Sequence, residues 1–93
     1  MGTKVRRRLT PDGGAWESFT AGRWDRVGRT GDVGIVVVNR PTVFQGRWAV
    51  IRHARQIGRF STLREAQDWV DALLATEREA LGRRLSLEAV FND

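Results

Sequence analysis

The sequence predicts an α+β domain, in which a small antiparallel sheet of three to five strands packs against one long C-terminal helix. Residues 1–60 are rich in Gly, Val, Ile and Trp and contain frequent turn signals, which is typical of strands and tight turns. From Ser61 onward, apolar residues recur at three- and four-residue spacing, which is typical of an amphipathic helix. A sheet with one apolar face needs a cover, and this helix is the only long amphipathic segment that can supply it.

Strand-like segments in the first part of the chain are separated by turn residues. Pro11 with Gly13 and Gly14 predicts the first reversal, and Gly28 with Gly31 predicts the second, because proline presets a turn angle and glycine accepts positive φ. The third reversal, near Ala54 and Arg55, lacks glycine. The predicted pairs are Lys4–Leu9 with Ala15–Phe19, Trp24–Val27 with Val33–Val38, and Arg47–His53 with Gln56–Phe60. The almost wholly apolar Val33–Val38 is expected to be a central strand.

The helix is predicted over about residues 62–81. Thr62 and Glu65 have the spacing of a capping box, in which the threonine hydroxyl accepts from the backbone N–H three residues later. Gly82 is the expected end, since glycine is common just past the last helical turn. The remaining tail, residues 83–93, is expected to form a short helix capped by Ser86 or to lie against the sheet. The predicted apolar stripe consists of Leu63, Ala66, Trp69, Val70, Leu73 and Leu74.

The composition limits which functions this chain can have. Its 93 residues predict a single domain over 1–93, too small to enclose a deep catalytic cavity. There is no cysteine, and His53 is the only histidine, so we expect no metal, no cofactor and no catalytic triad. The apolar runs are too short for a membrane span or a signal peptide, which leads us to expect a cytoplasmic protein. The sequence therefore predicts a protein that is not an enzyme.

Positive charge is concentrated in the strand-rich part of the chain. Residues 1–60 contain twelve basic and four acidic residues, a net charge of +8, whereas residues 61–93 have a net charge of −3. This division predicts a basic surface for a polyanion, supported by an acidic helix. The face of the sheet that the helix leaves uncovered is the expected place for it.

Arginines on the predicted strands are the candidate binding residues. The guanidinium group donates two parallel hydrogen bonds to a phosphate and can read guanine in the same way, and a β-ribbon can enter the major groove. The sequence thus favours a nucleic-acid-binding module, with duplex DNA as its expected partner. Strand alternation would direct Arg6 and Arg8 to one face and Arg7 to the other. The candidate residues are Arg6, Arg7, Arg8, Arg47, Arg52, His53, Arg55 and Arg59.

One stretch resembles a known DNA-binding family. Two segments resemble the strand–strand–helix signature of the arm-site DNA-binding domain of phage tyrosine integrases. The first is Arg47–Arg52, with the sequence Arg-Trp-Ala-Val-Ile-Arg, and the second is Gly58–Trp69, of the form G-x-F-x-T-x-x-E-A-x-x-W. The resemblance covers about residues 47–74. It implies a sheet that enters the major groove and directs Arg47, Arg52, Arg55 and Arg59 toward DNA. The arginine-rich, lysine-poor composition also resembles that of small proteins from actinobacteria and their phages.

A second hypothesis belongs to another class. The chain could be a small phage-type factor that binds a host protein or forms a homodimer. Aromatic residues dominate many interface hot spots, and exposed Trp16, Trp24, Phe44 or Phe91 would then form the contact. Alternatively, Val33–Val38 could lie at a sheet edge and pair with a strand of the partner. The sequence leaves open the strand order, the oligomeric state and the choice between DNA and RNA.

Overall fold

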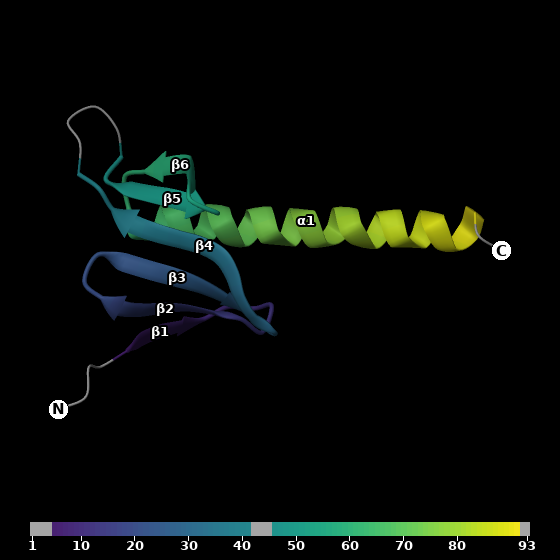
Figure 1. The fold of residues 1–93 in the computed structure, drawn as a ribbon, viewed down its shortest axis with the longest axis horizontal. Helices are drawn as coiled ribbons and strands as arrows, with labels where there is room; N and C mark the ends of the chain where they lie inside the picture. Colours follow the sequence, from purple (N-terminus) through teal and green to yellow (C-terminus); the bar gives the residue numbers. More distant parts are fainter. Residues whose placement is uncertain (1–4, 42–45, 92–93) are drawn as a thin grey trace.

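The fold is a six-stranded antiparallel sheet with one helix, which confirms the α+β class (Figure 1). The computed structural model describes residues 5–41 and 46–91, with side chains as far as Leu85. The strand order is β1-β2-β3-β4-β5-β6, so every strand pairs with its neighbours in the chain. The expected number of three to five strands is wrong because all six predicted segments join one sheet. The elements are β1 Arg6–Leu9, β2 Ala15–Thr20, β3 Arg23–Gly28, β4 Gly31–Asn39, β5 Trp48–Arg52, β6 Arg55–Phe60 and α1 Leu63–Phe91.

The reversal without glycine is a two-residue turn between β5 and β6. His53 and Ala54 have φ values of 49° and 67°, and Arg52 pairs directly with Arg55. Positive φ at both central positions is typical of the type I′ turn that closes tight hairpins. His53 also lies close to β4, because a Cβ built on Gly34 would be 2.8 Å from its Cε1 atom. The turn therefore forms by tertiary packing, without the Asn-Gly or Gly-Gly pair that usually favours it.

The hydrophobic core lies between one face of the sheet and the first three turns of α1. Ala66 and Val70 of the helix are fully buried and belong to the same cluster as four sheet residues. The helix also contacts β6, since the ring centroids of Phe60 and Trp69 lie 5.4 Å apart. Trp69 lies at the margin of the core, with 37% of its surface exposed. The buried sheet residues of the cluster are Trp16, Ile35, Val37 and Val50.

The N-terminal cap of α1 follows the prediction, whereas its end does not. The Glu65 backbone N–H donates to the Thr62 hydroxyl over 3.1 Å, as expected for a capping residue. The helix continues through Gly82 to Phe91, so the predicted end and separate tail are wrong. Gly82 has no positive φ, and a glycine inside a helix costs only about 1 kcal/mol relative to alanine. The good helix formers on both sides of it outweigh that cost.

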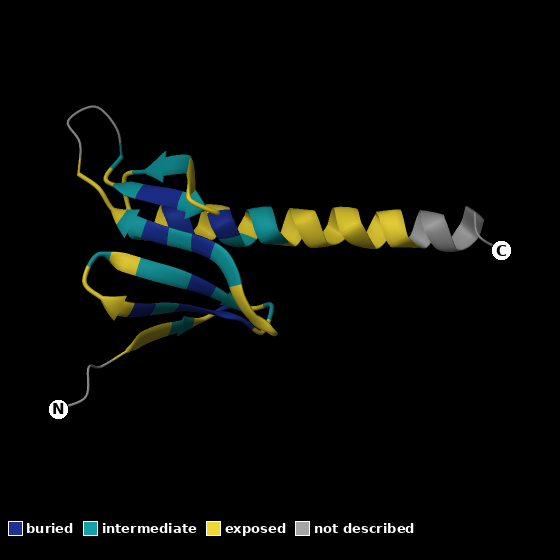
Figure 2. Cartoon of the chain, viewed as in Figure 1, coloured by how far each residue is buried: buried dark blue, intermediate teal, exposed yellow. Residues whose placement is uncertain are grey.

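The second half of α1 projects beyond the sheet (Figures 1 and 2). This projection extends the molecule to 55 Å along its longest axis, against 22 Å along its shortest. Leu81 and Leu85 lie on the projecting part, and each exposes 55% of its surface. They extend the apolar stripe that ends at Leu74, because residues four and seven positions apart share one helix face. In the described part of the chain, no helix has the length and apolar character needed to cross a membrane.

A buried ion-pair network connects the sheet to the helix. Arg26 exposes only 1% of its side chain and contacts Asp12 at 2.7 Å and Asp71 at 3.0 Å. Its guanidinium group lies over the ring of Trp16, whose indole N–H also donates to Asp71. Burial disfavours the charged form of Asp12, but hydrogen bonds from Thr10, Gly14 and Arg26 outweigh this effect and hold its pKa at about 2. The network makes Arg26 a structural residue.

Candidate nucleic-acid interface

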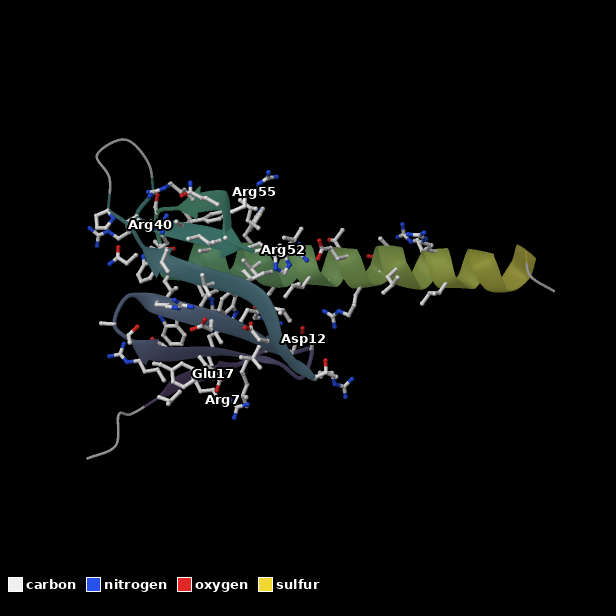
Figure 3. The ribbon with its side chains drawn as sticks, in the orientation of Figure 1. Arg7, Asp12, Glu17, Arg40, Arg52 and Arg55 are labelled. Carbon is white, nitrogen blue, oxygen red and sulfur yellow. The ribbon has the colours of Figure 1, made fainter. Side chains whose placement is uncertain are left out.

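Successive arginines of β1 point to opposite faces of the sheet, as strand alternation predicted. Arg8 lies on the face covered by the helix, where it donates to Gln67 over 2.6 Å and contacts Asp68 at 3.5 Å. Arg7 lies on the uncovered face and pairs with Glu17 at 3.8 Å (Figure 3). Both cations are partly neutralised by neighbouring groups. They do not form a common phosphate-binding surface.

Arg52, His53 and Arg55 lie at the end of the sheet where α1 departs from it (Figure 3). Arg52 reaches the helix and donates to both carboxylate oxygens of Glu77, over 2.7 and 2.9 Å. This hydrogen bonding lowers the pKa of Glu77 and raises that of Arg52. The bidentate pair occupies the donors that phosphate would need. The predicted group of eight residues is therefore divided between the two ends of the sheet.

Three arginines meet at the other end of the sheet, beside the β4–β5 connection. The Arg40 N–H donates to the Arg47 carbonyl over 2.6 Å, which continues the ladder one residue beyond Asn39 and Trp48. Since Trp48 faces the helix, alternation places Arg40 and Arg47 side by side on the uncovered face. Nη1 of Arg59 donates to the carbonyls of Arg40 and Gly46, over 3.0 and 2.6 Å. We call Arg40, Arg47 and Arg59 the arginine cluster.

The arginine cluster has little negative charge around it. Among the described residues, none of its three members forms an ion pair with a carboxylate. Arg23 lies in the same row of the sheet as Arg59, but it pairs with Asp25 at 3.1 Å. Like charges held close together repel unless an anion lies between them. The positive charge of the cluster is thus not compensated by a carboxylate of the described residues.

Arg40 was absent from the predicted residues, although it belongs to the cluster. It follows the last residue of β4 and precedes Pro41, which marked it as the end of a strand. Arg40 lies beside Arg47 and Arg59 because β4, β5 and β6 pair in a particular register. The charge itself was the only signal in the sequence, and Arg40 shares that signal with fifteen other cations.

The aromatic residues of the second hypothesis occupy different environments. Trp16 is fully buried beneath α1, so its predicted exposure is wrong, because its ring fills the core and its N–H bonds to Asp71. Trp24 is half-buried on the same face of the sheet. Phe44 and the side chain of Phe91 lie outside the described residues. Val33–Val38 belongs to β4, which has neighbours on both sides and is not an edge strand.

A hollow of about 410 Å³ opens on the helix-facing side, at the same end of the sheet as the arginine cluster. We call it the tryptophan hollow, since Trp24 and Trp48 line it from β3 and β5. Leu63, the first residue of α1, contributes to its lining, and Arg6 brings a cation to it. The remaining lining residues include Ser18 and Phe19.

The described residues contain no group of three or more His, Asp or Glu side chains that could hold a metal ion. No protein-family model, curated protein or solved structure matches this chain.

Proposed function

We propose that this protein is a non-enzymatic nucleic-acid-binding module that holds backbone phosphates, those of duplex DNA in the first place, with the arginine cluster. One observation carries the proposal: Arg40, Arg47 and Arg59 lie together on one face, with no carboxylate paired to them among the described residues. Phosphates spaced along a nucleic-acid backbone are the natural partners of such a group.

The geometry favours contacts to the backbone over insertion of the whole sheet into a groove. The centre of the uncovered face carries Glu17 and Asp25, which already pair with Arg7 and Arg23, so this part of the face offers no net positive charge to the phosphates on either side of a groove. The cluster, in contrast, lies at one end of the sheet, where a duplex can approach without meeting these acids. The groove insertion implied by the resemblance to integrase arm-site domains stays a prediction.

Exchanging two arginines of the cluster for glutamine is expected to weaken DNA binding and to reduce its salt dependence. Each phosphate contact changes the slope of log K against log salt by about −0.9. The double substitution R40Q/R47Q should therefore make the slope less steep by about 1.8, with a similar loss for every duplex sequence. Fluorescence anisotropy on a labelled duplex at several salt concentrations measures both effects.

The matched control is R29Q/R55Q, which removes the same charge at the opposite end of the sheet. Arg29 and Arg55 are exposed, as Arg40 and Arg47 are. Binding by the cluster requires the control to keep the wild-type slope. Equal losses from both double variants would show a general effect of net charge, and absence of binding by the wild-type protein at low salt would refute the proposed function.

A second candidate function, self-association, is favoured by the projecting half of α1. Leu81 and Leu85 expose an apolar stripe, and a hollow of about 370 Å³ lies beside Leu74 and Leu81 where the helix leaves the sheet. We propose a second copy of this chain as the occupant. An antiparallel pair that meets near Leu81 brings Glu79 of each copy close to Arg83 of the other, in addition to the Glu79–Arg83 pair within each copy, and this alternation of opposite charges is favourable.

Self-association predicts that L81E gives a monomer, whereas A80E leaves the dimer intact. Both substitutions add one negative charge to neighbouring exposed positions, but only Leu81 lies on the apolar stripe. Sedimentation velocity over a range of protein concentrations measures the molecular mass. A wild-type protein that stays monomeric at every concentration, or an A80E variant that dissociates as L81E does, contradicts this candidate.

A further inference from the structure

We infer that the tryptophan hollow binds an unpaired base of the nucleic acid whose phosphates the arginine cluster holds. This inference rests on the proposed function and adds to it a substrate class: nucleic acid with a single-stranded segment or end. It assigns a role to the exposed side of Trp24 and Trp48, and to Arg6, which belongs neither to the core nor to the arginine cluster.

The lining of the hollow fits a planar aromatic ligand. Trp24 and Trp48 lie on the same face of β3 and β5, with β4 between them. Both pack against the core on one side and line the hollow on the other, so their rings are held in place. Every base has a π-face that can stack on such an indole ring, which makes the contact tolerant of sequence. The hollow's volume of about 410 Å³ lies in the range of small-ligand sites.

Charge at the hollow suits a nucleotide better than an uncharged ring. Arg6 is exposed and lines the hollow, and no described residue forms an ion pair with it. Ser18 gives its hydroxyl hydrogen to the Thr20 carbonyl over 2.9 Å, so the polar group beside Arg6 is satisfied within the protein. A cation next to two indole rings matches the phosphate and the base of one nucleotide.

The hollow and the arginine cluster can hold one continuous strand. Arg47 and Trp48 are consecutive residues, so their Cα atoms are about 3.8 Å apart while their side chains point to opposite faces. A single strand that passes round this end of the sheet places phosphates on Arg40 and Arg47 and a base against Trp48. A duplex cannot follow that path with its bases paired, which is why the hollow selects an unpaired base.

The test compares oligothymidylate with an abasic oligonucleotide of the same length, titrated against the wild-type protein. Both carry the same number of phosphates, so the arginine cluster binds them equally. Stacking should make the oligothymidylate bind at least about fivefold more tightly, and its binding should change the tryptophan fluorescence. Equal affinity for the two oligonucleotides overturns the inference and leaves the proposed function standing. Absence of binding to either oligonucleotide and to duplex DNA at low salt removes the proposed function itself.

A pair of variants tests which tryptophans are involved. W24L removes a ring from the hollow, and W69L removes a partly exposed ring that packs on Phe60 outside the hollow. W24L should lose the preference for oligothymidylate over the abasic oligonucleotide, and W69L should keep it. Circular dichroism checks that both variants fold. Retention of the preference by a folded W24L variant contradicts the inference, and the wild-type comparison decides it even where W24L does not fold.

Discussion

Replacement of Arg26 by methionine is expected to lower the free energy of unfolding by about 3–5 kcal/mol. Arg26 is buried to 99% and forms ion pairs with Asp12 and Asp71, so its removal leaves two carboxylates close together without their common cation. A domain of this size has a total stability of about 5–15 kcal/mol, so the loss is a large part of the whole. Urea unfolding followed by circular dichroism measures it.

The control for this substitution is R29M, which makes the same chemical change on an exposed residue of the β3–β4 turn. Such a surface substitution should change the free energy of unfolding by no more than about 0.5 kcal/mol. If R26M were as stable as R29M, the ion pairs of Arg26 would contribute nothing to the free energy of unfolding, and the apolar core with the other sheet–helix contacts, such as Arg52 with Glu77, would hold the helix.

The same network makes the free energy of unfolding depend on pH. The pKa of Asp12 lies near 2 in the folded protein and near 3.8 in an unfolded chain, so the unfolded state binds more protons between these values. The stabilisation by this carboxylate is complete above about pH 4 and is lost as the pH falls toward 2, with a size on the order of 2 kcal/mol. In R26M this loss of stability at low pH should be smaller, because Arg26 is one of the groups that lower the pKa of Asp12.

Local patterns in the sequence were sufficient to predict most of the elements. Thr62 and Glu65 located the start of the helix, since a cap depends on residues only three positions apart. The turn glycines located two hairpins, and the apolar run in β4 marked a central strand. Gly82 misled the prediction of the helix end, because a glycine signals an end only when its backbone takes positive φ, and here it does not.

The candidate site depended on contacts between residues far apart in the chain, which local patterns do not contain. Arg26 and Arg59 are both arginines on strands, yet one is buried between carboxylates and the other lies in the arginine cluster. The difference comes from the register of each strand and from where α1 lies. Trp16 and Trp24 differ for the same reason, because the helix covers one and leaves the other half-exposed at the hollow.

Substitution of Gly46 by alanine is expected to lower the free energy of unfolding by about 2–3 kcal/mol and to weaken DNA binding as well. A Cβ built on Gly46 lies 2.3 Å from the carbonyl carbon of Phe60 and 2.4 Å from its oxygen, so the backbone of β6 would have to move. The Gly46 carbonyl accepts a hydrogen bond from Arg59, and the next residue is Arg47. The displacement therefore reaches two members of the arginine cluster directly.

The same substitution at Gly82 provides the control and should have the opposite sign. A Cβ at Gly82 meets no atom within 4 Å, and the backbone there is helical, so alanine should raise the free energy of unfolding by about 0.5–1 kcal/mol. DNA affinity should stay at the wild-type value, since Gly82 lies nineteen residues, about 28 Å, along α1 from Leu63, which is at the cluster's end of the sheet. A G46A variant as stable as the wild-type protein would show that Gly46 does not press against the backbone of β6, and the cluster would then lose the contact that positions Arg59.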